Sequence, residues 1–176
     1  FSFTSLAEND FSQFEIKHGK GGFKQAKHFT FLKRAIQSQG EFVIYDQQVY
    51  WQTTTPVRSE LLIWADGIYR RNEGEQNYQV ITQDEQINQL LAKLLSGQIQ
   101  GSDWQISPST QSTCYELVPI LSEVALMFKH VELCRDGPKQ REIVITDQQN
   151  NKTHITMQIN TEELGQRDKD AVKLTH

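Results

Sequence analysis

The sequence lacks the features that would place the protein in a membrane or on a nucleic acid. No apolar run approaches the roughly 20 residues that a membrane-spanning helix needs, and Leu61 to Ala65 is among the longest. Lysine and arginine total 18 against 22 acidic residues, so the concentrated basic surface of a nucleic-acid-binding protein is not expected. We therefore expect one soluble domain over residues 1–176, with no transmembrane segment and no nucleic-acid partner.

Catalytic and metal-binding motifs are lacking as well. The five histidines show no metal-ligand spacing, and the neighbours of Cys114 are a threonine and a tyrosine. Gly19-Lys-Gly-Gly22 does not have the spacing of a phosphate-binding loop and is better interpreted as a flexible turn. No Gly-x-Ser-x-Gly, kinase or dinucleotide-binding signature occurs. The sequence therefore predicts no catalytic residue, no metal and no cofactor, and it argues against an enzyme.

What the sequence does contain is a series of short strands. Alternation of apolar and polar residues, together with aromatic and β-branched content, predicts strands over 23–31, 40–51, 61–65, 78–81, 115–118, 131–134, 141–146 and 153–159. Asp66-Gly67 is a turn signal that closes the third of them. Short helices are expected over 5–14 and 122–129, and the charged tail over 161–176 is either a terminal helix or disordered. The chain is thus predicted to have an α+β layout.

One strong helix separates the two groups of strands. Thr82 and Glu85 have the spacing of a capping box at its start, and Gly97 is a natural stop. Between them the apolar residues recur with helical period and form one stripe: Ile87, Leu90, Leu91, Leu94 and Leu95. Because such a stripe must cover an apolar surface, we expect this helix to lie on the sheet as a lid.

Two cysteines are compatible with one disulfide bond. If Tyr115 and Leu117 face the interior on one strand, and Val131 and Leu133 do so on the next, antiparallel pairing sets Cys114 opposite Cys134 on the outer face. For the bond to form, the two cysteines would have to be a non-hydrogen-bonded pair, whose side chains lie closer together. Two reduced, half-buried cysteines are the alternative.

The stretch from Lys17 to Arg34 is locally basic. It contains six basic residues: Lys17, Lys20, Lys24, Lys27, Lys33 and Arg34. Such a stretch either contacts an anionic partner or forms a solvated rim, and the solvated rim is the preferred interpretation.

A succession of motifs resembles the periplasmic lipoprotein carrier (LolA-like) family. The motifs are Phe23-Lys-Gln-Ala-Lys27, Gly40-Glu-Phe42, Trp51 followed by Pro56, Leu61-Leu-Ile-Trp-Ala-Asp-Gly67, Asp103-Trp104 and Tyr115-Glu-Leu-Val-Pro119. The likeness runs in order over residues 23–159. It implies an incomplete antiparallel β-barrel, a curved half-barrel whose concave apolar face is lidded by helices and receives acyl chains.

The resemblance also implies where the acyl chains bind. Period-two alternation selects the inward residues as Val43, Tyr45, Val49, Trp51, Leu61, Ile63, Tyr115, Leu117, Val131 and Leu133. From the residues alone, the packed core of a sandwich explains this pattern more simply, and the resemblance favours the cup. One departure stands out: the family places a gating arginine on the strand before the tryptophan, and the matching position here is Tyr45.

The function expected on this basis is transport without catalysis. The protein is expected to carry the acyl chains of a lipoprotein, or of a glycolipid, between an inner-membrane donor and an outer-membrane acceptor of a Gram-negative envelope. It is expected to be a periplasmic monomer whose signal peptide has been removed, since the sequence opens at Phe1 without methionine. The alternative is an accessory module of the envelope that uses the same fold to hold a protein partner.

Overall fold

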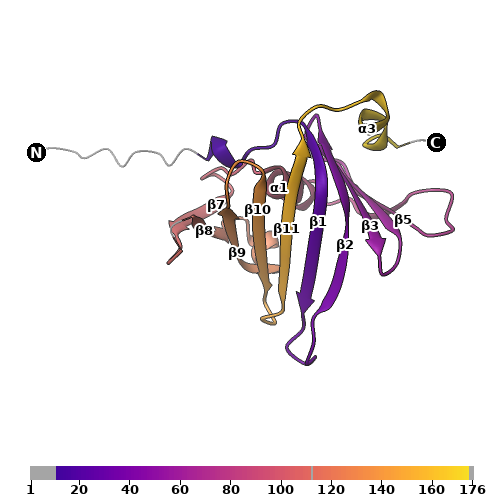
Figure 1. Ribbon diagram of the computed structural model, residues 1–176. Helices are drawn as coiled ribbons and strands as arrows, with labels where there is room; N and C mark the ends of the chain where they lie inside the picture. The colour runs from indigo at the N-terminus through magenta and orange to yellow at the C-terminus, as the bar shows by residue number, and fades with distance from the viewer. Residues whose placement is uncertain (1–10, 112, 175–176) are drawn as a thin grey trace, which may run out of the picture.

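Over the residues that the structure describes, the protein forms one curved antiparallel sheet with three short helices (Figure 1). The structure is a computed structural model, and it describes residues 11–111 and 113–174. The first group of elements is a 3-10 turn and six strands: η1 (Ser12–Phe14), β1 (Gly19–His28), β2 (Ile36–Tyr45), β3 (Gln48–Thr55), β4 (Ser59–Ile63), β5 (Ile68–Asn72) and β6 (Gln79–Thr82). The helix expected over 5–14 lies mostly outside the described residues.

The second group begins with the lid helix. It consists of α1 (Glu85–Ser96), β7 (Trp104–Pro108), β8 (Cys114–Pro119), α2 (Ser122–Ala125), β9 (Phe128–Arg135), β10 (Gln140–Asp147), β11 (Lys152–Thr161) and α3 (Gln166–Ala171). The α+β layout is therefore confirmed. Strands β5 and β7 were not predicted, because each is only five residues long and lacks a clear apolar alternation.

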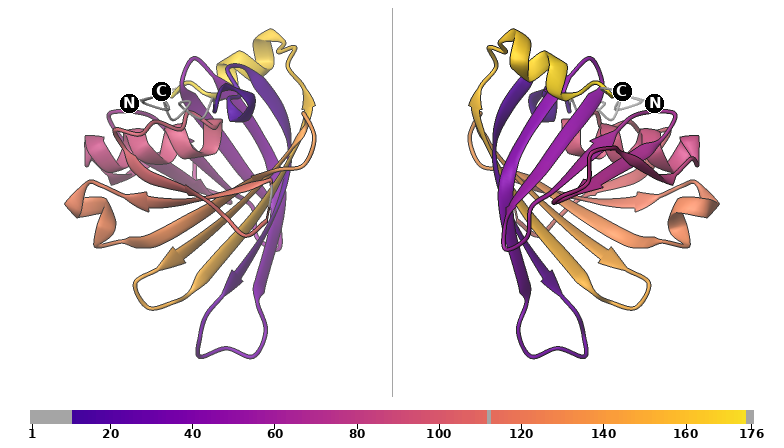
Figure 2. Two further views of the ribbon diagram at one scale, coloured as in Figure 1. Left: turned by 90° about the vertical axis from the view of Figure 1, so that its left-hand side faces the viewer. Right: turned by 90° about the vertical axis from the view of Figure 1, so that its right-hand side faces the viewer.

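All eleven strands belong to a single open sheet. Their order is β6-β5-β4-β3-β2-β1-β11-β10-β9-β8-β7, so each half of the chain is a meander, and the pairing of β1 with β11 joins the two. The sheet is strongly curved in the side views (Figure 2). Its concave face carries the main apolar cluster, to which nearly every strand contributes.

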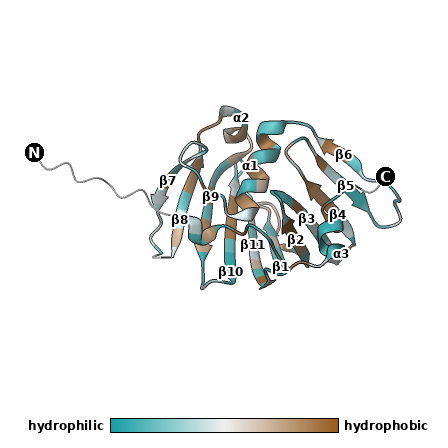
Figure 3. Ribbon diagram, turned by 90° about the horizontal axis from the view of Figure 1, so that it is seen from above, coloured by the Kyte–Doolittle hydropathy of each residue, from teal (hydrophilic) through white to brown (hydrophobic). Residues whose placement is uncertain are grey.

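Helix α1 crosses the concave side of this sheet. It follows β6 and precedes β7, which occupy the two opposite edges, so the helix must span the space between them. Its 12 residues give it a length of about 18 Å. From above, α1 lies over the middle of the sheet, between the two groups of strands (Figure 3).

The ends of α1 differ in one respect from the prediction. The N-cap is Asp84, whose carboxylate accepts a hydrogen bond from the Ile87 N–H at 3.1 Å, and not Thr82. Thr82 instead accepts a hydrogen bond from the Asp84 N–H, so the capping-box prediction was wrong by two residues. Gly97 ends the helix as predicted, in the left-handed conformation with φ of 73°.

The C-terminal segment packs on the outer face of the sheet. The predicted tail contains the short helix α3, which contacts β2. Val172 is fully buried, and its carbonyl accepts a hydrogen bond from Trp64 Nε1 at 2.8 Å. Lys20 of β1 forms an ion pair with Asp168 of α3 at 2.8 Å. These contacts hold α3 on the side opposite to α1.

The register between β8 and β9 is the one predicted, and it contains a disulfide bond. Tyr115 pairs with Leu133, Leu117 pairs with Val131, and Cys114 lies opposite Cys134 with 4.1 Å between the Cα atoms. Cys114 and Cys134 form a non-hydrogen-bonded pair, in which the side chains lie closer together, because the adjacent pair carries the hydrogen bond from the Arg135 N–H to the Thr113 carbonyl. Antiparallel pairing therefore places the two sulfur atoms within bonding distance.

We expect the native protein to be oxidised at this pair. Mass spectrometry without reductant should give a mass lower by the two thiol hydrogens, and replacing both cysteines with serine should lower the free energy of unfolding by about 2–4 kcal/mol. Alkylation of both thiols in the untreated native protein would contradict the assignment.

Candidate functional site

The concave face brings together eight of the ten predicted binding residues. On one side Val49 pairs with Ile63 and Trp51 pairs with Leu61, so all four point to the same face. On the other side Tyr115, Leu117, Val131 and Leu133 occupy neighbouring positions of β8 and β9. All eight belong to, or pack against, one continuous apolar cluster. The prediction that they share a face is therefore confirmed.

Val43 and Tyr45 point to the opposite face, and their assignment to the concave face was wrong. Residues 40–51 are two strands and not one, because Asp46 and Gln47 form a tight turn with φ of 50° and 62°. A two-residue turn shifts the alternation by one position between the strands. Ile44, opposite Val49, is the residue of this part of β2 that faces the concave side.

Tyr45 consequently cannot act on the lid. Its ring lies 5.0 Å from the His18 ring, and the ammonium group of Lys169 in α3 lies 5.6 Å from its centre. These contacts belong to the outer face, where α3 packs. No gating role is available to Tyr45 from this position.

Aromatic side chains fill the centre of the concave face. The Phe23 ring stacks on Trp51 with 3.9 Å between ring centres, and the Phe42 ring also stacks on Trp51 with 6.0 Å between ring centres. Gly40 is paired with Phe23 in the adjacent strand, and a Cβ atom there would lie 1.8 Å from the Gln52 carbonyl oxygen. The missing side chain at Gly40 therefore permits the close approach of this position to the backbone of β3. Phe23 and Phe42 were not among the predicted binding residues.

The lid stripe covers this face as predicted. Leu90 and Leu94 are buried in the apolar cluster, and Ile87, Leu91 and Leu95 pack against it. Asn88 of the same helix is fully buried, and neither polar atom of its side chain has a hydrogen-bond partner among the described residues. Each such atom costs about 1–3 kcal/mol, so the packing of α1 on the sheet includes a destabilising element.

A buried arginine holds the segment that packs beside the lid. Arg141 of β10 donates to the carbonyl oxygens of Phe14 at 3.2 Å and Gln13 at 2.9 Å. It also donates to three carbonyls of its own hairpin, those of Gly137, Pro138 and Gln140. Burial, and then the charge of Arg135, lower the pKa of Arg141. All hydrogen-bond acceptors of Arg141 among the described residues are main-chain oxygens, so its charge is balanced by dipoles and not by a carboxylate.

The held segment closes one side of the lid. Phe14 is buried in the apolar cluster, and Phe11 and Phe14 make edge-to-face contacts with Tyr115. The Ile16 N–H donates to the Ser96 carbonyl at the end of α1 at 2.7 Å. Arg141 was a strand residue in the sequence analysis but not a site residue. The sequence did contain a signal for this role, because Arg141 occupies the same alternating positions of the strand as Ile143 and Ile145, whose side chains face the concave side.

An open hollow lies beside this closure. It has a volume of about 910 Å³ and is bounded by the segment around Phe11, by residues 97–101 after α1, and by Ile106 of β7. Phe11 and Ile106 also pack against the apolar cluster. The hollow therefore borders the concave apolar interior where α1 ends.

A polar cluster lies on the outer face of β3, β4 and β5. Glu60 accepts hydrogen bonds from Tyr50 at 2.6 Å and from Arg71 at 2.7 Å, and the Arg71 guanidinium stacks on the Tyr78 ring at 4.4 Å. Burial raises the pKa of Glu60, but the hydrogen bonds from Arg71 and Tyr50 outweigh it, and the net pKa is lowered. Burial, followed by the charge of Glu60, raises the pKa of Tyr78 to about 12. Both carboxylate oxygens are engaged, so the cluster serves to pin three strands together.

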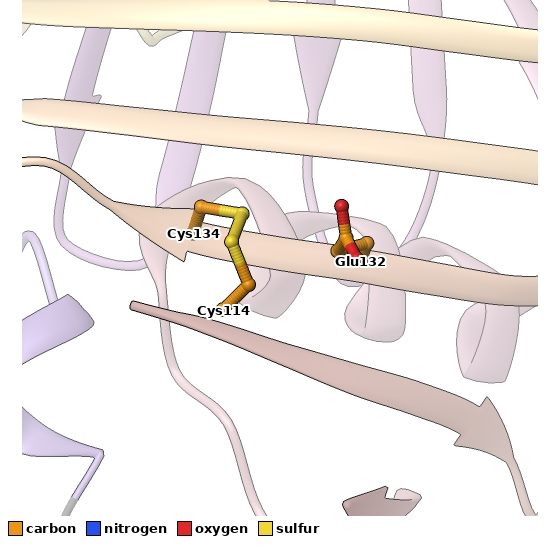
Figure 4. A group of neighbouring side chains, drawn as sticks. All are labelled: Cys114, Glu132 and Cys134. Atoms are coloured by element: carbon orange, nitrogen blue, oxygen red, sulfur yellow. A yellow bond between two sulfur atoms is a disulfide. The ribbon is translucent and has the colours of Figure 1, made fainter. Parts of the chain in front are cut away.

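The disulfide lies close to one carboxylate. Glu132 comes two residues before Cys134 on β9, and the three side chains of Cys114, Cys134 and Glu132 lie together (Figure 4). Glu132 accepts a hydrogen bond from the Ser109 hydroxyl at 2.8 Å. Since the sulfur atoms are bonded to each other, they are not thiolate ligands, and the group offers a metal a single carboxylate.

Comparison with known proteins yields no family. The sequence matches none of the protein-family models and shows no significant similarity to a curated protein. Among the described residues, no helix has the length and apolar character required to cross a bilayer. The function must therefore be argued from the geometry.

The Glu60 cluster generates a pH-dependent prediction. The pKa of the Glu60 carboxyl is lower in the folded protein than its ordinary value of 4.5. The ionised carboxylate therefore contributes its full stabilisation well above pH 4.5, and this contribution is lost as the pH falls through the folded-state pKa. We expect Glu60→Gln to lower the free energy of unfolding at pH 7 by about 1–3 kcal/mol and to flatten its fall below pH 4.5. Urea unfolding at several pH values measures both effects.

The matched control is Glu41→Gln, which changes an exposed carboxylate on β2. It should leave the free energy of unfolding at pH 7 within about 0.5 kcal/mol. An equal loss of stability in the two variants would show that the hydrogen bonds to Glu60 contribute nothing specific.

Proposed function

We propose that the protein is a non-catalytic carrier that binds the acyl chains of a lipidated molecule between α1 and the concave face of the sheet. The observation that carries the proposal is the topology of the cover. The concave apolar face is closed by the amphipathic helix α1, by the short segment around Phe14 and, at one edge, by Val124 of α2, and none of these belongs to the sheet. The cover can therefore move away without breaking a hydrogen bond between strands.

The composition of the face suits alkyl chains. Val49, Trp51, Leu61, Leu117 and Val131 present aliphatic and aromatic surface without ionisable groups. Each methylene removed from water contributes about 0.8 kcal/mol, so a chain of about 14 carbons gains roughly 11 kcal/mol by entering. A bilayer offers nearly the same gain, so a carrier must bind the chain without trapping it.

Two features of the cover favour reversible opening. The unpartnered polar atoms of Asn88 destabilise the closed position of α1, and opening would return them to water. Arg141 holds the segment at Gln13 and Phe14 only through carbonyl oxygens, which water can replace. The hollow between Phe11 and Ile106 adjoins this closure and is the route by which a chain would enter.

The proposal includes the finer architecture and the setting. The open curved sheet with its helical cover is consistent with the half-barrel of lipoprotein carriers, a family that the motifs from Phe23 to Pro119 resemble. The disulfide between Cys114 and Cys134 is consistent with an oxidising compartment such as the periplasm. The donor and acceptor would then be proteins or lipids of the inner and outer membranes.

A second candidate is an envelope module that holds a protein partner. It is favoured by one observation, namely that side chains such as Phe42, Leu117 and Met157 are fully buried and already fill the concave side. Solvent extraction of the purified protein separates the two functions, because co-purified fatty or lipidated material supports the carrier.

The first prediction places a charge on the binding face. Leu61→Glu puts a carboxylate on the binding face, and the desolvation of its charge opposes binding. We expect the affinity for a fluorescent fatty-acid probe to fall at least about tenfold, since 1.4 kcal/mol corresponds to a factor of ten. The control Val57→Glu, in an exposed loop, should bind as the unmodified protein does.

Circular dichroism must confirm that both variants are folded. Equal probe affinity in a folded Leu61→Glu variant would exclude this face as the acyl site.

The second prediction concerns the cover. Arg141→Met keeps the volume of the side chain but removes the hydrogen bonds to Gln13 and Phe14. Loss of about 1 kcal/mol from the closed state should speed probe uptake about fivefold in stopped-flow fluorescence. Unchanged or slower uptake by a folded variant would contradict the role of this arginine in closure.

A further inference from the structure

We propose that the loop between β1 and β2 docks the protein on a lipid bilayer that carries anionic headgroups. The loop covers residues 29–35 and protrudes beyond the ends of the neighbouring strands (Figure 1, Figure 2). It lies away from the concave apolar cluster, which none of its side chains joins. The proposal therefore does not depend on acyl-chain binding.

The loop exposes apolar side chains that the fold does not use. Phe31 is 77% exposed, and Leu32 in the loop and Ile36 at the start of β2 are also exposed. Phe29 packs against Phe31 with 5.2 Å between ring centres. Large apolar residues gathered at a protruding tip, where no other part of the described chain covers them, indicate a contact surface.

Basic side chains surround this apolar tip. Lys33 and Arg34 lie within the loop, and the Lys27 ammonium lies 4.9 Å from the centre of the Phe29 ring. Lys152, at the start of β11, pairs with His28 at the end of β1. The sequence has no acidic residue between Glu15 and Glu41, so the loop itself carries charge of one sign. Asp147, at the end of β10, is acidic and lies within electrostatic reach of Lys27.

A second apolar site lies along the same rim. The Thr30 N–H donates to Asn151 in the turn between β10 and β11, and Lys129 at the start of β9 donates to Asn150 in that turn. Just before β9, Leu126 is 79% exposed and Met127 is also exposed. The rim thus presents two apolar contacts, joined by a turn and accompanied by lysines.

Charge complementarity and shape together favour a bilayer as the occupant. Aromatic and aliphatic side chains enter the interface between headgroups and acyl chains, while the surrounding ammonium and guanidinium groups meet the phosphates. The tip is convex, so it inserts readily into a deformable lipid surface, whereas a protein partner would need a matching socket.

Flotation with unilamellar vesicles tests the proposal. The full chain is mixed with vesicles of phosphatidylethanolamine and phosphatidylglycerol, or with vesicles of phosphatidylcholine alone. We expect binding to the first that weakens as salt is raised, and at least about fivefold weaker binding to the second, since each basic residue near an anionic surface contributes about 1 kcal/mol.

Variants identify the surface that binds. Phe31→Ser with Leu32→Ser should lower the partition coefficient at least about tenfold, because two large apolar side chains lose their burial in the interface. Lys33→Gln with Arg34→Gln should lower it by a similar factor on anionic vesicles only. The matched control is Val80→Ser with Ile81→Ser, which changes two residues of β6 that are 48% and 47% exposed and should leave binding within twofold.

The outcomes separate this proposal from the carrier function. Membrane docking would be overturned if the protein bound neither kind of vesicle, or if the tip variants bound as well as the control variant. Either result would indicate a protein partner for the tip. Fatty-acid probe binding should be unchanged in the tip variants. If neither the unmodified protein nor any variant binds the probe, the carrier proposal is overturned and the membrane-docking proposal is not affected.

Discussion

The pairing of β1 with β11 is the constraint on which the rest of the structure depends. Each half of the chain is a meander of neighbouring strands, and only this pair of strands, far apart in the sequence, joins them into one sheet. Once they are joined, β6 and β7 become opposite edges, and the short connection between them must cross the sheet. The apolar stripe of α1 decides which face it crosses, because Leu90 and Leu94 are buried only on the apolar, concave side.

The two faces of the sheet consequently have different roles. The concave face is apolar and is covered by elements outside the sheet, with an unsatisfied Asn88 and a clamp at Arg141 that uses only main-chain acceptors. The outer face is tied together by the disulfide across β8 and β9 and by the Glu60 cluster across β3, β4 and β5. Stabilising interactions are thus concentrated where the sheet must stay intact, and the cover rests on weaker ones.

Local patterns accounted for much of this arrangement. The strands β8 to β11, the lid stripe and the pairing of Cys114 with Cys134 followed from alternation and helical period, because each depends on residues close together in the chain. The errors arose where the pattern alone was ambiguous. The turn at Asp46 and Gln47 contains no glycine that would mark it in the sequence, so two strands were predicted as one. As a result, Val43 and Tyr45 were placed on the wrong face.

The sequence by itself determined that apolar residues would line one face of a sheet and that one helix would cover it, since both periods are properties of a few consecutive turns or strand residues. The tertiary structure alone decided how that face is closed. Arg141 meets Phe14 across 127 positions, and α3 returns to the outer face of β2 from the other end of the chain. Such contacts depend on which strands become neighbours, and the pairing of β1 with β11 is a choice among many strands of similar character that no local pattern specifies.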